Sequence, residues 1–128
     1  MSSKALAVAI GAASGAALTW LALRRKSHIR HIVLVKLKPE TPDEAIAEIL
    51  EKWAELPAKI PTILRMEIGR QRAAVDDGRN VTLGGVVEFA TDADYVAYAK
   101  DEAHLGVIRE YILPHIAAGG RTALQYVP

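Results

Sequence analysis

The sequence contains no cysteine among its 128 residues, so it has no disulfide, no thiolate metal ligand and no thiol nucleophile. Its four histidines, His28, His31, His104 and His115, do not show the close spacing that is typical of zinc sites. No internal repeat or low-complexity tract follows residue 26. We therefore expect one small domain that works without a metal or another cofactor.

Charge is missing from residues 5–23, ALAVAIGAASGAALTWLAL. As a helix this segment would be about 28 Å long at ~1.5 Å per residue, close to the ~30 Å hydrocarbon thickness of a bilayer. A cleaved signal peptide would have a shorter apolar core and small residues at the cut, whereas this core continues directly into LALRRK. The segment therefore predicts one uncleaved transmembrane helix.

The cations around this span predict its orientation. Lys4 precedes it and three cations follow at 24–26, so the positive-inside rule places the C-terminal domain on a cytosol-like side, whether cytosol, matrix or stroma. A mitochondrial or other organelle membrane fits this pattern. Gly11 and Gly15 form a small-xxx-small face for packing against another helix, although such residues are also simply common in membrane spans. We predict a membrane anchor and basic collar over residues 1–26, in contact with lipid, and a linker over 27–30.

The domain after the linker has fewer basic than acidic residues. Residues 31–128 hold 11 Lys and Arg against 15 Asp and Glu, which is a net charge of 11 − 15 = −4. A nucleic-acid-binding domain normally carries an excess of basic residues. The composition therefore argues against a nucleic acid as partner.

Strand and helix patterns alternate through residues 31–128 in the order βαββαβ. The predicted strands are 31–38, 63–69, 81–89 and 121–127; the predicted helices are 41–56, a segment that starts at Thr91, and 102–116. This order is the split unit of ferredoxin-like α+β folds, in which helices cover one face of a four-stranded antiparallel sheet. The other face keeps apolar side chains, so we expect two such sheets to pack face to face as a dimeric α/β barrel.

Local signals refine these elements. Thr41, followed by Pro42 and Glu44, predicts a capping box at the start of the first helix. Gly84 and Gly85 predict a bulge or a close backbone approach in the third strand. Gly119-Gly120 predicts the end of the last helix.

Six stretches of the domain match one family. They include HIVLVKLK before an acidic helix, LPAKIPTI, DDG before the third strand and YVAYAKDEAHLGV. Together they resemble the stress-responsive dimeric α/β-barrel domain over about residues 30–127. The resemblance implies a homodimeric barrel with one pocket per subunit between the sheet and its helices. Its best-characterised relative is olivetolic acid cyclase, a plant enzyme that closes a polyketide chain without a metal or cofactor.

The resemblance also implies site residues. His104 matches a histidine that acts as a base, and Tyr98 matches a tyrosine that assists it as an acid. His31 matches a pocket histidine, Leu83 stands where the cyclase has a further one, and Tyr95 is expected in the same ligand pocket.

The spacing of Tyr98 and His104 sets a condition on this chemistry. Six residues correspond to about 600° of rotation around a straight helix, so the two side chains converge only if the helix breaks near Asp101. In the alternative interpretation His104 only stabilises that break, while Tyr95 and Tyr98 pack on the sheet.

Two function classes follow. The first is a membrane-anchored dimeric binding protein, which serves as an accessory subunit of a membrane complex or holds a small apolar ligand. Its barrel is completed by a second copy or by another subunit. The second is a cofactor-free cyclase or lyase that acts on a lipophilic β-dicarbonyl compound, with His104 as base and Tyr98 as acid.

Overall fold

The computed structural model describes residues 29–128. The predicted membrane span at 5–23, with Gly11 and Gly15, lies outside the described residues. Within residues 29–128, no helix combines the length and the apolar character needed to cross a membrane.

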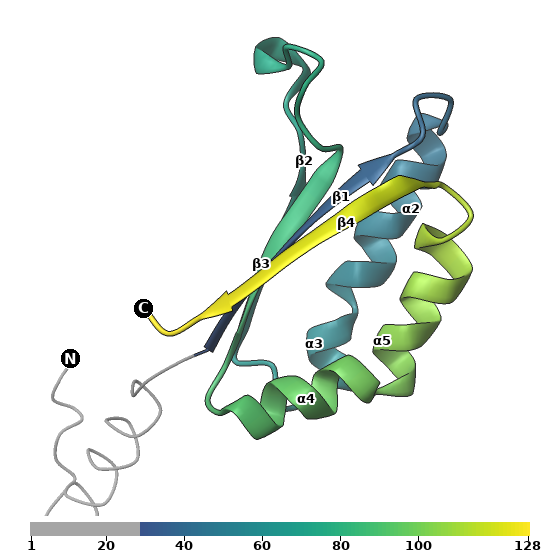
Figure 1. The fold of residues 1–128 in the computed structure, drawn as a ribbon. Helices are drawn as coiled ribbons and strands as arrows, with labels where there is room; N and C mark the ends of the chain where they lie inside the picture. Colours follow the sequence, from purple (N-terminus) through teal and green to yellow (C-terminus); the bar gives the residue numbers. More distant parts are fainter. Residues whose placement is uncertain (1–28) are drawn as a thin grey trace, which may run out of the picture.

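One four-stranded antiparallel sheet carries the α-helices on one of its faces (Figure 1). The strand order is β2-β3-β1-β4, so the two central strands come from the two halves of the βαββαβ unit. The predicted ferredoxin-like α+β fold is confirmed. The strands are β1 (Ile29–Leu37), β2 (Arg65–Arg70), β3 (Leu83–Phe89) and β4 (Ile116–Tyr126). The helical segments are α2 (Asp43–Ala54), α3 (Leu56–Lys59), η1 (Ala73–Val75), α4 (Asp92–Lys100), α5 (Glu102–Val107) and the π-helix η2 (Ile108–Ile112).

The core lies between β1, β3 and the helices. Alternate side chains of β1, from Ile29 to Leu37, point toward the helices and are buried. Val87 and Phe89 of β3 are completely buried beside them. From α2, Ile49 and Trp53 pack onto this surface with exposed fractions of 1% and 4%. One face of β1 therefore meets the helices while the other does not, as the two-residue period of a strand requires.

The start of α2 differs from the predicted capping box. The N-cap residue is Pro42, which has no side chain that can cap. The hydroxyl of Thr41 instead donates a hydrogen bond to the carbonyl of Lys38 at 2.7 Å, and so closes the turn after β1. At α4, by contrast, Thr91 is the N-cap and its Oγ1 accepts a hydrogen bond from the amide of Asp94 at 3.1 Å.

The prediction that Gly119-Gly120 ends the last helix is wrong. Both glycines lie in a bulge of β4, where Val35 pairs with Arg121 but Leu37 pairs with Ile116. Gly119 has a φ of 65°, and a Cβ on Gly120 would collide with the carbonyl oxygen of Lys36. A glycine pair after an apolar helix is typical of both a helix end and a strand bulge, so local sequence does not separate them.

The face of the sheet away from the helices keeps apolar side chains in contact with solvent. Leu34 on β1 is 39% exposed, Leu124 on β4 is 59% exposed and Tyr126 is 37% exposed. Leu34 pairs across the sheet with Thr122, and Ile32 pairs with Leu124. Since opposite residues of antiparallel strands share a face, these side chains form one apolar strip over β1 and β4.

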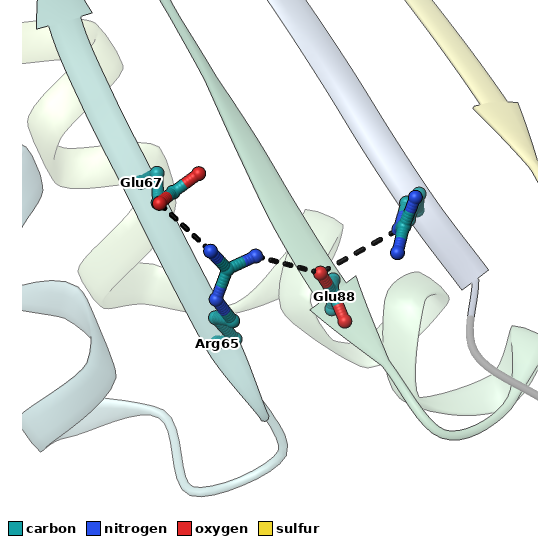
Figure 2. A network of polar contacts seen from close by, with 4 residues as sticks. Arg65, Glu67 and Glu88 are labelled. Carbon is teal, nitrogen blue, oxygen red and sulfur yellow. Dashed lines mark hydrogen bonds and ion pairs between the residues drawn. The ribbon is translucent and has the colours of Figure 1, made fainter. Parts of the chain in front are cut away.

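A charged network borders this strip on the side of β2 and β3. Figure 2 shows Arg65 between Glu67 and Glu88. Its guanidinium nitrogens lie 2.7 Å from a carboxylate oxygen of Glu67 and 3.0 Å from one of Glu88. On β1, Nε of Arg30 lies 3.5 Å from the same oxygen of Glu88. Glu88 is only 8% exposed, so its charge depends on both arginines.

Gly84 and Gly85 allow the central strands to approach closely without a bulge. A Cβ on Gly84 would lie 2.8 Å from the carbonyl oxygen of Val33, and one on Gly85 would lie 2.6 Å from that of Glu67. The pairing of β3 with β1 and β2 continues in register through both positions.

We therefore expect Gly85→Ala to lower the free energy of unfolding of the full-length protein by about 1–3 kcal/mol, because backbone atoms must move. Gly69→Ala on β2 is the matched control, since its Cβ would meet nothing within 4 Å. That control should be neutral or stabilising by up to ~1 kcal/mol. Equal unfolding midpoints for the two variants in denaturant would contradict the close approach.

Candidate functional site

The helix break predicted near Asp101 is present. The backbone of Asp101 is extended, with φ −66° and ψ 135°, so α4 ends at Lys100 and α5 begins at Glu102. The carboxylate of Asp101 accepts a hydrogen bond from the amide of Ala103 at 2.8 Å, which makes Asp101 the N-cap of α5. This turn brings the rings of Tyr98 and His104 to a centroid distance of 4.2 Å with planes 36° apart.

These two rings line a cavity between the sheet and the helices. The cavity encloses about 80 Å³. One water needs roughly 10–15 Å³ by the same measure, so the space suits a small organic molecule. Its walls are mostly aliphatic and come from β1, α2, α3, α4, α5, η2 and β4. The lining residues are His31, Val33, Val35, Trp53, Leu56, Tyr98, His104, Val107, Ile108, Ile112, Leu113, Ile116 and Arg121.

His104 faces this cavity in its neutral form. Burial is the main cause that lowers its pKa, and a contact with the Ala99 carbonyl acts in the opposite direction. Nδ1 of His104 lies 3.4 Å from that carbonyl oxygen, which can only accept a hydrogen bond. The proton therefore belongs on Nδ1, and the lone pair on Nε2 remains available to a ligand.

His31 is a second neutral imidazole in the cavity wall. It is only 2% exposed, and burial is the main cause that lowers its pKa. Its Nδ1 lies 2.6 Å from the side-chain oxygen of Gln125 on β4, the residue directly opposite on the sheet. With the Gln125 amide in this orientation, His31 donates through Nδ1.

Tyr98 provides a phenol that stays protonated. It is 1% exposed, and burial raises its pKa to about 12 although the Trp53 side chain acts to lower it. Its ring packs at 5.0 Å from Phe89 and at 6.1 Å from His31. At neutral pH Tyr98 can therefore donate a hydrogen bond to an oxygen in the cavity, as an acid and not as a base.

The two remaining predicted pocket residues, Leu83 and Tyr95, lie outside the cavity. Leu83 is 2% exposed in the core and does not line the cavity. Tyr95 is half-buried outside it and packs against His31 at 5.0 Å and Phe89 at 5.8 Å. His115 lies in the turn before β4, where its carbonyl accepts a hydrogen bond from the amide of Lys38. Residues 29–128 contain no cluster of side chains that could hold a metal ion.

Sequence reasoning missed two contributors to the cavity wall, Arg121 and η2, and one residue that holds a wall residue in place, Gln125, which contacts His31. Arg121 and Gln125 lie on the helix-facing side of β4, where they pair with Val35 and His31. The alternation Arg-Thr-Ala-Leu-Gln does place Arg121 and Gln125 on one face, but only the pairing shows which face. The other missed contributor is η2, a π-helix, and π-helical turns frequently occur at functional sites.

Known structures share this fold over most of the chain. A dimeric ferredoxin-like protein of unknown function from Thermobifida fusca is 22% identical, with a TM-score of 0.70 over 81% of this chain and 93% of its own. A dimeric ferredoxin-like protein of unknown function from Bacteroides fragilis is 25% identical, with a TM-score of 0.65 over 79% and 96%. Hydroxynitrile lyase from Passiflora edulis is 20% identical, with a TM-score of 0.66 over 79% and 93%.

Sequence comparison assigns the family directly. No curated protein matches the chain significantly. The family model of the stress-responsive A/B barrel domain, however, matches residues 29–127, which is nearly the whole of the described fold. The chain therefore belongs to the stress-responsive A/B barrel domain family.

Proposed function

We propose that the protein is a membrane-anchored homodimer that binds one small apolar molecule per subunit. The cavity under the helices carries this proposal. Its wall is aliphatic except for a few polar groups, which is the usual composition of a small-molecule site. His31, Tyr98 and His104 supply fixed polar contacts within it, so a guest would be oriented as well as buried.

The uncovered face of the sheet supports the homodimer. Leu34, Leu124 and Tyr126 leave an apolar strip in water, and a second copy would cover it face to face. The charged network of Arg30, Arg65, Glu67 and Glu88 borders the strip and would lie at the rim, where polar groups are tolerated. The relatives from Thermobifida fusca and Bacteroides fragilis are described as dimeric.

The membrane attachment rests on the sequence alone. Residues 5–23 have no charge and are followed by a basic collar, which orients the domain toward a cytosol-like compartment. In such a position the domain could receive an apolar guest from the bilayer or act as an accessory subunit of a membrane complex.

A second candidate function is a cofactor-free cyclase or lyase. It is favoured by the 4.2 Å approach of Tyr98 and His104 at the cavity wall. Nε2 of His104 would take a proton from a carbon acid next to a carbonyl, and the Tyr98 hydroxyl would donate a hydrogen bond to the oxygen on which negative charge develops. The similar structure from Passiflora edulis is a hydroxynitrile lyase, so the fold accommodates lyase chemistry.

Dimerisation is tested by placing a charge on the apolar strip. Leu124→Arg should convert the protein from twice its 13.8 kDa chain mass to a monomer, because burying an unpaired cation costs several kcal/mol. Val96→Arg, on the exposed side of α4, is the control and should remain dimeric. Analytical ultracentrifugation measures both, and a dimeric Leu124→Arg variant would refute this interface.

Ligand binding is tested by filling the cavity. Ile108→Trp should displace the guest, because the larger side chain occupies the space beside His104. Val96→Trp introduces the same side chain outside the cavity. Native mass spectrometry of protein extracted from its own membranes should show one small molecule per chain in the wild type and in Val96→Trp, and none in Ile108→Trp.

The same spectra separate the versions of the proposal. Additional protein subunits would support the accessory role, whereas a homodimer with a small molecule would support ligand storage alone. A wild-type homodimer with an empty cavity would count against ligand binding.

The enzyme hypothesis predicts a defined pH dependence. His104→Gln should reduce turnover of a β-dicarbonyl substrate by about 10²–10⁴-fold, while His115→Gln should leave it unchanged. Because burial lowers the pKa of His104, its neutral form persists below pH 6.5, and kcat/KM should stay constant down to that pH before it falls. A rate that already halves above pH 6.5, or an active His104→Gln variant, would eliminate His104 as the base.

A further inference from the structure

We propose that the cavity selects a small apolar carboxylate, whose anionic group is bound by Arg121 at the mouth while its hydrocarbon part packs under the helices. This inference rests on the proposed ligand-binding function and specifies the charge of the ligand. It concerns a residue that neither the sequence motifs nor the Tyr98–His104 pair includes.

The position of Arg121 comes from the bulge in β4. The register shift between Val35 and Leu37 ends where Arg121 pairs with Val35, a buried residue on the helix-facing side of β1. Arg121 therefore points to the same side as Val35 and lines the cavity together with Leu113 and Ile116. Its side chain remains exposed, which places the guanidinium at the boundary between the apolar wall and solvent.

The residues that line the cavity include the positive charge of Arg121 but no negatively charged side chain. Within residues 29–128, every ion pair uses other cations, so no described carboxylate neutralises Arg121. Burial is the main cause of the lowered pKa of His31 and His104, and the positive charge of Arg121 lowers both further. Arg121 is therefore the charged group to which an anion in this cavity would bind.

The shape of the site fits a carboxylate at one end of a short chain. A guanidinium presents a planar fork of N–H donors that matches the two oxygens of a carboxylate. Beyond it the wall is formed by Val107, Ile108 and Ile112, which offer only apolar contact. With about 80 Å³ available, a chain of roughly six carbons is an appropriate probe.

The test compares hexanoate with hexanamide, a neutral molecule of nearly the same shape, on the full-length protein by ligand-observed NMR titration. We expect the wild type to bind hexanoate up to about fivefold more tightly than hexanamide, since an exposed ion pair contributes at most about 1 kcal/mol. Arg121→Gln should remove this preference and leave hexanamide binding unchanged. Arg72→Gln, which removes a cation from the exposed loop after β2, should retain the preference.

The outcomes separate this inference from the proposed function. If the wild type binds both probes equally, or if Arg121→Gln keeps the preference for hexanoate, the assignment of Arg121 is overturned while the apolar cavity remains a ligand site. If neither probe binds the wild type, and Ile108→Trp also shows no loss of a natural guest, both the proposed function and this inference fail.

Discussion

The extended backbone at Asp101 is the constraint on which the site depends. In an unbroken helix Tyr98 and His104 would face different directions. The side chain of Asp101 stabilises the break, because it caps α5 through the amide of Ala103 at 2.8 Å. The new helix direction then carries His104 to Tyr98 and continues into η2, whose Ile108 and Ile112 form part of the cavity wall. The break at Asp101 is therefore what allows His104 and Tyr98 to meet in the cavity wall.

The two faces of the sheet have different surroundings, the cavity and core on one side and the apolar strip on the other. Alternate residues of β1 either enter the cavity and core, as His31 and Val35 do, or reach the opposite face, as Leu34 does. A period of two residues means that one strand can line the cavity with one face and carry the apolar strip on the other. The buried Glu88 between two arginines adds a fixed polar feature to the docking side. A change of register by one residue would exchange these two faces, and the pairing of β3 with β1 and β2 runs without a shift through Gly84 and Gly85.

The sequence predicted the element order, the fold and the break at Asp101, because these follow from periodicity, capping residues and the family motifs. The sequence-based prediction was wrong where the same short pattern of residues is compatible with two local conformations. Gly119-Gly120 resembles a helix end but forms a bulge, and Thr41 resembles a cap but closes a turn. Arg121 was missed for a related reason: its place in the cavity is set by pairing with β1, a contact between distant parts of the chain that local patterns do not contain.

The central claim is that burial holds two neutral imidazoles in the cavity wall, with the His104 ring beside that of Tyr98 and its Nδ1 at the Ala99 carbonyl. An apolar binding protein and a cofactor-free enzyme both need this state, which is why the same geometry supports both functions. ¹⁵N NMR of histidine-labelled full-length protein measures it most directly. We expect His31 and His104 to titrate below pH 6.5 and to carry the proton of the neutral form on Nδ1. Titration of His104 above pH 6.5, or a proton on its Nε2, would contradict this claim.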